Sequence, residues 1–412
     1  MFSNIWFNII LVLIIFDFIF SSILEYINDK NWKNYVPDEL KKFYPSEKYK
    51  KARDYKLETG KISFLSSSIS LILTMVLIIF GVYGIVSDSI TRITESIFFQ
   101  SILFFSIFYL INYIINLPIK FYSTFVVEEK FGFNKTTKKL FLIDQIKSLL
   151  LSALIGGGLL FSAVKLFVIF KESFWIYLWL GLSIFLIFIN TFYATLIIPI
   201  FNKLEPLSDG ELRSKINEYS KMIGYSLKNI FIIDGSKRST KANAFFSGMG
   251  PKKTIALYDT LIENHTDEEL LAVLAHEVGH YKKNHVFKGL ILSIAQIGLM
   301  CFLFQLCLNE DEISYALGAQ MPSFHLGLIG FSLLYSPIGL ITGLMMNIFS
   351  RKNEYEADKF AKDTYNGKYL SLALKKLSAN NLSNLYPHPF YVYIHYSHPP
   401  LLKRLRALKT KT

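Results

Sequence analysis

The segment His276-Glu277-Val278-Gly279-His280 has the residue types and the spacing of a hydrolytic metal centre. Two histidines four residues apart lie one above the other on a helix face, where their imidazoles can bind one Zn²⁺ ion at about 2.0–2.1 Å. Glu277 projects toward the same side and can accept a proton from an attacking water. The pattern predicts a zinc hydrolase with one metal ion per chain, His276 and His280 as ligands and Glu277 as general base.

Zinc in a catalytic site needs a third protein ligand and an open fourth position. The segment 350–358 offers Glu354 for this role. Asp358 is four residues further on the same helix face and suits a carboxylate that holds a ligating histidine in place. His285 is expected to support the site or the structure rather than to bind the metal. Glu356 lies on the opposite face of the helix and is given no role.

These two segments are far apart in the chain, but the apolar runs beside them can bring them together. The metal helix ends where the apolar run 286–308 begins, and the segment 350–358 begins where the run 323–349 ends. An antiparallel pair of membrane-crossing helices returns the chain to the same membrane face. His280 and Glu354 can therefore meet although they are 74 positions apart.

The C-terminal segment adds two basic candidates, His398 and Arg404. Either side chain could donate a hydrogen bond to a developing oxyanion or to a substrate carbonyl, as a catalytic residue would. Basic residues beside a membrane also commonly contact lipid headgroups. Both interpretations stay open at this point.

The polar segment 201–285 has the pattern of a small α+β unit. Its last helix begins with a capping box, in which Thr266 caps the helix and Glu269 reaches back. The preceding elements are a helix at 208–223 and strands at 230–233, 243–246 and 254–258. The metal motif therefore lies on a helix that is predicted independently of the motif.

The composition indicates a membrane protein. Hydrophobic residues make up 52% of the 412 residues and charged residues only 18%, so most of the apolar surface must face lipid or line an intramembrane core. Seven apolar runs are long enough to cross about 30 Å of hydrocarbon. They lie near 4–26, 62–88, 97–117, 146–170, 174–200, 286–308 and 323–349. In the fourth run, Gly156, Gly157 and Gly158 predict close helix packing.

The basic residues lie between these runs, which argues against a nucleic-acid partner despite the net charge of +12. The connections 27–61 and 118–140 carry ten and five Lys or Arg residues, whereas the loops on the other side carry only Arg92 and Lys171. The positive-inside rule then predicts an outside or lumenal N-terminus and a zinc site that faces the cytosol. The membrane would be the endoplasmic reticulum in a eukaryote and the inner membrane in a bacterium.

The chain resembles the type I CAAX prenyl proteases, which are integral-membrane zinc metalloendopeptidases, along almost its whole length. The resemblance rests on the seven runs, the H-E-x-x-H motif and stretches at 125–137, 199–204, 237–239, 243–246 and 259–261. It implies a barrel of seven helices around a large water-filled chamber, closed on the cytosolic side by the zinc domain. It also supports Glu354 as third ligand, and His398 and Arg404 as residues that contact the substrate. The chain departs from the family at Lys241-Ala242, where His-Ser is frequent.

The resulting hypothesis is a zinc metalloendopeptidase whose substrate, as the resemblance implies, is a prenylated protein that loses the last three residues of a C-terminal C-a-a-X. An extended substrate would pair with the strand of Asn243, Ala244, Phe245 and Phe246, although this strand could also be a plain structural edge. The expected parts are the spans of 1–200, the metallopeptidase domain 201–285, the spans of 286–349 and the segment 350–412, which completes the zinc site.

Three alternatives remain. A membrane zinc protease for quality control would act on misfolded or damaged proteins, and this substrate is the better hypothesis if the source organism lacks prenylation. A heptahelical receptor would share the seven spans but would not need a capped zinc helix, and metal analysis separates the two. A non-catalytic membrane scaffold would keep its function after Glu277→Gln.

Overall fold

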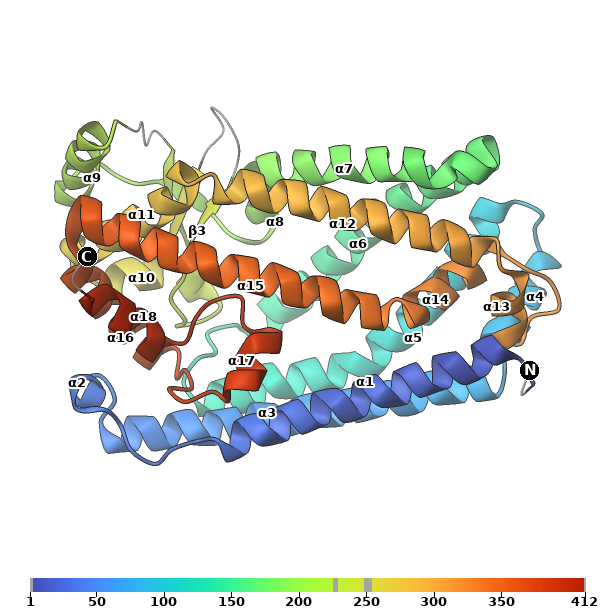
Figure 1. Cartoon of the computed structure of the whole chain (residues 1–412), viewed down its shortest axis with the longest axis horizontal. Helices are drawn as coiled ribbons and strands as arrows, with labels where there is room; N and C mark the ends of the chain where they lie inside the picture. The colour runs from blue at the N-terminus through green and yellow to red at the C-terminus, as the bar shows by residue number, and fades with distance from the viewer. Residues whose placement is uncertain (1–2, 225–228, 248–253, 411–412) are drawn as a thin grey trace.

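Long apolar helices make up most of the chain and run along the longest axis of the molecule (Figure 1). The computed structural model describes residues 3–224, 229–247 and 254–410. A small sheet and the last helices lie at one end of this axis, and the N-terminus lies at the other. The long helices are α1 (Ile5–Lys30), α3 (Ser46–Ile79), α5 (Ile97–Tyr122), α6 (Lys138–Phe170), α7 (Phe174–Phe192), α12 (His285–Leu308) and α15 (Ser336–Ala361).

Among the described residues, five helical segments are long and apolar enough to cross a membrane. A sixth results if the bent pair that starts with α14 (Phe324–Leu334) and continues into α15 counts as one span. One of the five, Lys138–Phe201, is 64 residues long and contains both α6 and α7. These two helices are joined by the short 3₁₀ turn η2 (Lys171–Ser173) and pack against each other. The chain is thus a mostly helical membrane protein.

Two of the expected spans differ from the helices of the structure. The run 62–88 does not form one helix, because α3 ends at Ile79 and Gly81, with φ of 61°, separates it from the short helix α4 (Val82–Thr91). The run 323–349 was expected as a single helix but bends by 56° between α14 and α15. A proline in the first turn of α15 explains the break, since proline lacks an N–H and favours a helix start.

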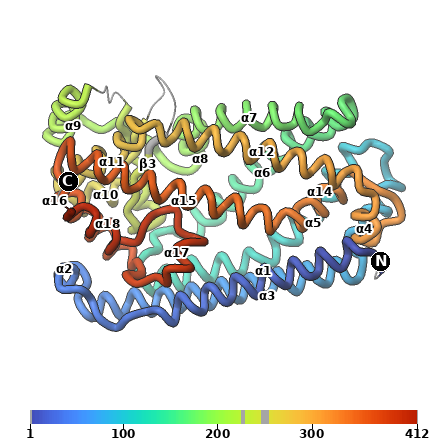
Figure 2. Tube along the Cα trace, in the orientation of Figure 1, coloured from blue at the N-terminus to red at the C-terminus, as the bar shows by residue number. Residues whose placement is uncertain are grey.

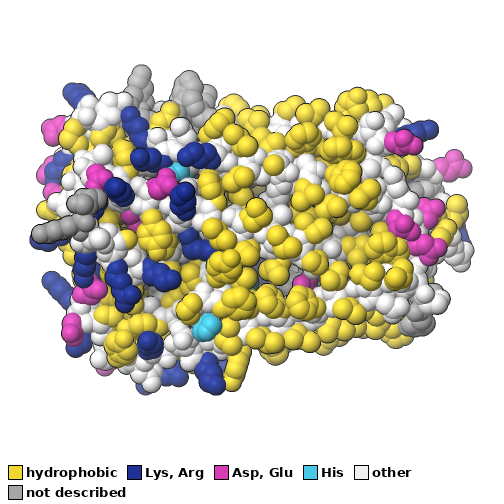
Figure 3. Space-filling model, in the orientation of Figure 1, with side chains coloured by type: hydrophobic (Ala, Val, Ile, Leu, Met, Phe, Trp, Pro, Cys, Tyr) yellow, Lys and Arg dark blue, Asp and Glu magenta, His cyan; other side chains and the backbone are white. Residues whose placement is uncertain are grey.

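The surface of the bundle is hydrophobic along its middle (Figure 3). Large apolar side chains of the membrane helices are exposed, among them Leu154 of α6, which is 74% exposed, and Ile184 of α7, which is 69% exposed. Exposure of so wide an apolar surface to water would be unfavourable, so these faces suit contact with the hydrocarbon of a bilayer. Most Lys and Arg side chains in this view lie at the end of the molecule that carries the sheet.

In the described part of the chain, the sheet has four strands in the order β1-β2-β4-β3. Its strands are β1 (Leu204–Pro206), β2 (Ile230–Ile233), β3 (Ala244–Ser247) and β4 (Thr254–Tyr258). Strand β4 is parallel to β2 and antiparallel to β3, with Ala244 opposite Leu257. The three expected strands are confirmed to within one residue, and β1 was not predicted. Strand β3 lies at the edge of the sheet, so among the described residues one side of it has no strand partner.

The helix α11 (Asp267–Lys282) packs beside the sheet and carries the H-E-x-x-H motif. Its predicted capping box is present, since Thr266 accepts from the Glu269 N–H and the Glu269 carboxylate accepts from the Thr266 N–H. Helices α9 (Glu211–Met222) and α16 (Gly367–Asn380) share one buried apolar cluster with α11 and the sheet. The remaining helices are α2 (Asp38–Lys41), α8 (Ile198–Phe201), α10 (Asp259–Asn264), α13 (Asp311–Ala316), α17 (Pro389–His395) and α18 (Leu401–Lys409). Three π-helical segments are η1 (Ser123–Glu128), η3 (Tyr193–Ile197) and η6 (Lys362–Asn366).

Candidate functional site

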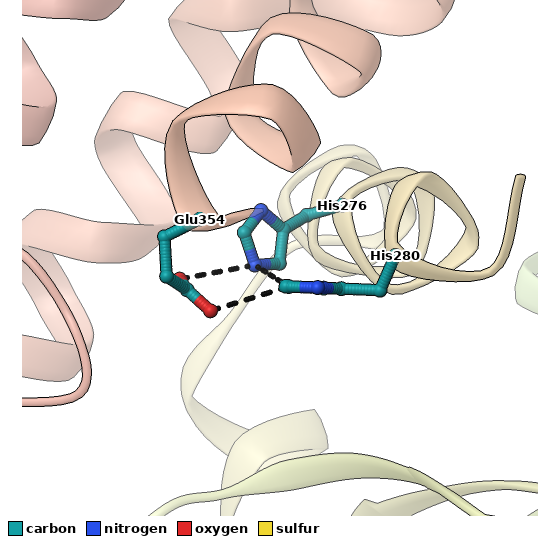
Figure 4. A group of neighbouring side chains, drawn as sticks. All are labelled: His276, His280 and Glu354. Atoms are coloured by element: carbon teal, nitrogen blue, oxygen red, sulfur yellow. Dashed lines mark hydrogen bonds and ion pairs between the residues drawn. The ribbon is translucent and has the colours of Figure 1, made fainter. Parts of the chain in front are cut away.

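His276, His280 and Glu354 converge at one point (Figure 4). The Nε2 atoms of the two histidines are 3.2 Å apart. The Glu354 carboxylate lies 3.5 Å from His276 Nε2 through Oε2 and 3.2 Å from His280 Nε2 through Oε1. All three possible ligand atoms lie within 4.8 Å of one another, so this group could hold one metal ion.

The three residues meet because α11 and α15 pack closely against each other. Gly279, the fourth residue of the motif, lies at their contact. A Cβ atom at this position would be 3.1 Å from the Cα of Ala357, closer than side chains ordinarily approach. Because Ala357 is one helix turn beyond Glu354, a glycine at 279 allows α15 to bring the Glu354 carboxylate up to the histidines.

A buried ion pair supports the first histidine. His276 Nδ1 lies 3.0 Å from Asp358 Oδ1. The Arg404 guanidinium holds Asp358 with two hydrogen bonds, 2.8 Å from Nε to Oδ2 and 2.5 Å from Nη2 to Oδ1. Arg404 also reaches Glu354, with 3.2 Å between Nη1 and Oε2. Arg404 therefore contacts both carboxylates of α15 that face the site.

A second chain of contacts supports the other histidine. His280 Nδ1 lies 3.1 Å from His285 Nδ1, and His285 Nε2 lies 3.1 Å from Glu356 Oε2. The Glu356 carboxylate can only accept, so His285 donates from Nε2 and its Nδ1 becomes an acceptor. His280 must then donate from its own Nδ1, which leaves the lone pair of its Nε2 directed at Glu354.

These tautomers are inferred from the hydrogen-bond network, and they fit a metal ion. His276 also donates from Nδ1, to Asp358, so two Nε2 lone pairs and a carboxylate point at the same place. The buried Glu354 Oε2 accepts no hydrogen bond within the described part of the chain. Three converging electron donors of the His, His and Glu types suit a divalent cation, and zinc in particular.

The electrostatics of the group favour positive charge. Burial alone would lower the pKa of the His276 imidazole, because it disfavours the charged form. Its contacts with the Asp358 and Glu354 carboxylates outweigh this effect and raise the pKa to about 9. A cluster that stabilises a proton in this way also stabilises a bound cation.

The site opens into a cavity of about 590 Å³. Glu277 lines this cavity, and so do Asn243, Ala244 and Phe245 from the edge strand and its approach. The side chain of Phe246 lies outside the described residues. His398 also lines the cavity. Its Nε2 lies 3.3 Å from Glu354 Oε1, and its side chain is 64% exposed, so it is free to meet a ligand.

The residues before the edge strand are attached to the membrane helices. Lys241 Nζ donates to the Tyr55 hydroxyl at 2.7 Å and lies 3.0 Å from the Glu128 carboxylate. It also lies 4.4 Å from the centre of the Phe133 ring. The position where the chain departs from the family thus ties strand β3 to α3 and η1.

Glu356 is the supporting residue that sequence reasoning missed. It was set aside because it lies on the opposite face of α15 from Glu354. On one continuous helix His285 would lie nearly in line with His276, nine residues before it, but Asn284, with φ of 57°, separates α11 from α12. The turn directs His285 toward both His280 and Glu356. No local signal in the sequence marks this contact.

The helical bundle, the small mixed sheet and the His-His-Glu group define a multi-pass membrane metallopeptidase. Residues 206–412 match the family described as Peptidase family M48. Residues 25–203 match the family described as CAAX prenyl protease N-terminal, five membrane helices. The chain belongs to the CAAX prenyl protease 1 family, within the M48 metallopeptidases, and it is not one of the heptahelical receptors considered above.

Related proteins support this assignment over nearly the whole chain. The CAAX prenyl protease 1 homolog of Dictyostelium discoideum is 36% identical and covers 95% of this chain and 94% of its own. The CAAX prenyl protease 1 of Saccharomyces cerevisiae is 33% identical and covers 95% and 92%. The crystal structure of S. mikatae Ste24p aligns with a TM-score of 0.92 and 34% identity over 98% of this chain and 99% of that one.

Proposed function

We propose that this metallopeptidase uses zinc to remove the last three residues of a prenylated protein that ends in C-a-a-X. The observation that carries the proposal is the convergence of His276, His280 and Glu354 in the cavity that Glu277 and the edge strand also line. The names of the relatives, which are CAAX prenyl proteases, support the substrate class.

In this proposal His276, His280 and Glu354 hold the zinc ion. When bound, zinc polarises the scissile carbonyl and makes a water nucleophilic at neutral pH. Glu277 removes a proton from the attacking water and delivers it to the leaving amine. Glu277 is free for this role because it does not belong to the ligand group.

The other site residues position these groups or the substrate. Arg404 and Asp358 hold His276 and Glu354 in place, so we assign Arg404 to positioning rather than to substrate contact. His398 is exposed beside Glu354 and suits a donor to the oxygen of the substrate carbonyl. Strand β3 would receive the substrate as an added strand, because its outer edge is unpaired in the sheet and borders the cavity.

We further propose seven membrane crossings around a chamber, with the zinc site on the cytosolic side. Counting α6 and α7 separately, and α14 with α15 as one bent span, gives this number. The two termini lie at opposite ends of the long axis, as an odd number of crossings requires (Figure 2). In this arrangement 201–285 and 350–412 build the cytosolic part, and 1–200 and 286–349 build the membrane part. The membrane would be the endoplasmic reticulum in a eukaryote and the inner membrane in a bacterium.

The test uses the full chain, purified in detergent, and a farnesylated C-a-a-X peptide with its unprenylated twin. Wild type should release the last three residues of the farnesylated peptide, as read by mass. Glu277→Gln should keep its zinc but lose about 10²–10⁴-fold in rate, because only the general base is removed. Retained cleavage by Glu277→Gln would show that the base is assigned wrongly. Cleavage of denatured membrane proteins but of neither peptide would favour the quality-control function instead.

A further inference from the structure

A second cavity lies inside the bundle, away from the metal centre. It has a volume of about 870 Å³, within the range of roughly 300–1,000 Å³ that small-molecule sites occupy. Side chains of α5, α6, α7, α12 and α14 line it, and most of them are hydrocarbon. Only Ser106, Tyr109, Ser152 and Cys301 bring a hydroxyl or thiol group to the lining. A cavity with so apolar a lining suits an apolar guest.

One face of α12 borders both this cavity and the cavity of the metal centre. Val286 lines the cavity of the metal site, whereas Ile297 and Phe304 line the apolar cavity. Ile297 and Phe304 are 11 and 18 residues after Val286. Because a helix turns by about 100° per residue, all three side chains lie on nearly the same face of α12. Ile297 lies about 16 Å along the helix from Val286, at about 1.5 Å per residue. A long chain attached near the metal could therefore follow α12 into the apolar cavity.

The opposite side of the interior has a different character. A third cavity, of about 1100 Å³, lies between α3 and α5, and its lining includes the hydroxyl and amide groups of Ser66, Ser70, Asn112 and Asn116 beside many apolar side chains. It shares Tyr109 and Phe105 with the apolar cavity, so the two adjoin. Polar residues are costly at membrane depth unless they line hydrated space or bind polar groups. The interior is thus more polar between α3 and α5 than in the apolar cavity.

We propose that the apolar cavity binds the isoprenoid chain of the substrate. This inference rests on the proposed function, because removal of the last three residues places the prenylated cysteine directly before the scissile bond. The isoprenoid then starts beside the metal centre while the peptide pairs with β3. The chain is purely hydrocarbon, and burial of each of its carbons away from water is favourable. The cavity along α12 offers that burial within the molecule.

The glycines of α6 allow a matched test. Gly156 lines the apolar cavity, and a Cβ atom there would meet nothing within 4 Å. Gly158 also has open space around its Cβ position but does not line the cavity, and it lies about 200° away around the helix. The expected close helix packing at 156–158 is wrong, since only Gly157 has a neighbour within 4 Å, Ile102 Cδ1 at 3.9 Å. Gly156→Leu therefore fills the cavity, and Gly158→Leu changes helix propensity equally without filling it.

The measurement compares kcat/KM of full-length variants for farnesylated, geranylgeranylated and unprenylated peptides. Gly156→Leu should lower kcat/KM for the geranylgeranylated peptide by about 10-fold relative to the farnesylated one, because the longer chain needs the filled volume. Gly158→Leu should keep the wild-type ratio. An unchanged ratio in active Gly156→Leu would overturn the isoprenoid site and leave the proposed function standing. Failure of wild type to cleave any prenylated peptide would instead contradict the proposed function.

A binding measurement covers the case in which Gly156→Leu does not fold. A farnesylated peptide with a diazirine on its terminal isoprene unit is cross-linked to full-length Glu277→Gln, and the adducts are mapped by mass. The proposal expects adducts within 152–163 and 297–304, and an excess of unlabelled prenylated peptide should remove them. Adducts confined to other segments would overturn it. The same conclusion would follow if a diazirine phosphatidylcholine labelled these segments and the prenylated peptide did not compete.

Discussion

At the scale of single residues, the two metal-facing histidines are held through the nitrogen that points away from the metal position. His276 relies on Asp358 and Arg404, and His280 relies on His285 and Glu356. Such partners fix the tautomer and the ring orientation of a ligand. Both imidazoles are therefore prepared to bind a cation before it arrives.

The contacts that link Glu356 to His280 through His285 lead to a prediction about metal affinity. Glu356→Ala should weaken zinc binding by about 10–100-fold, because His285 is no longer held as an acceptor for His280. Glu356→Gln should remain close to wild type, since its amide oxygen can still accept from His285 Nε2. Competition with a chromophoric chelator on purified protein measures both variants. Equal weakening by Ala and Gln would mean that the charge of Glu356 matters rather than its hydrogen bond.

Glu354 is expected to be essential for metal retention. Its removal takes away one of three ligands and leaves the buried Arg404 with Asp358 as its only carboxylate partner at the site. Glu354→Ala should therefore release zinc to the same extent as His276→Ala, as measured by elemental analysis after gel filtration. Glu263→Ala, an exposed acid on α10, serves as control. Full zinc occupancy in Glu354→Ala would transfer the third-ligand role to another residue.

At the scale of elements, the site depends on the close approach of α11 and α15. The approach requires the absence of a side chain at Gly279, and it sets the distance between the histidines and Glu354. The break between α11 and α12 at Asn284 adds to this arrangement, because it sets the direction in which α12 leaves the site.

This contact can be tested with a single methyl group. Gly279→Ala should lower stability by about 1–3 kcal/mol, because tightly packed backbones must move apart, and should weaken zinc binding at the same time. Gly343→Ala on α15 is the matched control, since its Cβ would meet nothing within 4 Å. Thermal unfolding in detergent and chelator competition measure the two effects. Wild-type values for Gly279→Ala would show that the helices can separate without cost.

At the scale of the whole molecule, charge and hydropathy define which end belongs to which side. Most Lys and Arg side chains in Figure 3 lie at the end that carries the sheet, and the hydrophobic belt lies between the two ends. The positive-inside rule predicts that this end faces the cytosol, as proposed above. The metal centre, the edge strand and the C-terminal segment would then all be reached from the cytosol.

Cysteine labelling tests this orientation. Cys301 and Cys307 are free, so both are first replaced by alanine. In that background Lys42→Cys should react with a membrane-impermeant maleimide from the cytosolic face of sealed vesicles, and Glu95→Cys only from the other face. Both positions are exposed. Lys42 lies on the connection before α3, and Glu95 lies on the connection between α4 and α5, at the other end of the bundle. Reversed labelling would invert the proposed topology.

Much of the molecule could be predicted from local patterns. The metal motif, its capping box, the apolar runs and three of the four strands each leave a signal within about ten to twenty neighbouring residues, because helix and strand periodicities are local. The two places where these local patterns failed also have a physical cause. Gly81 ended α3 early, and the bend before α15 divided a run that hydropathy alone reads as continuous.

By itself, the sequence determined that this is a membrane protein with a zinc-type motif on a capped helix. Only the tertiary structure decided that Arg404 binds Asp358 with two hydrogen bonds, that Glu356 supports His280 through His285, and that the interior is more polar between α3 and α5 than in the apolar cavity. These features join segments far apart in the chain, and their contacts depend on helix crossings rather than on periodicity. Side chains that become neighbours only through packing leave no trace in the order of residues along the chain.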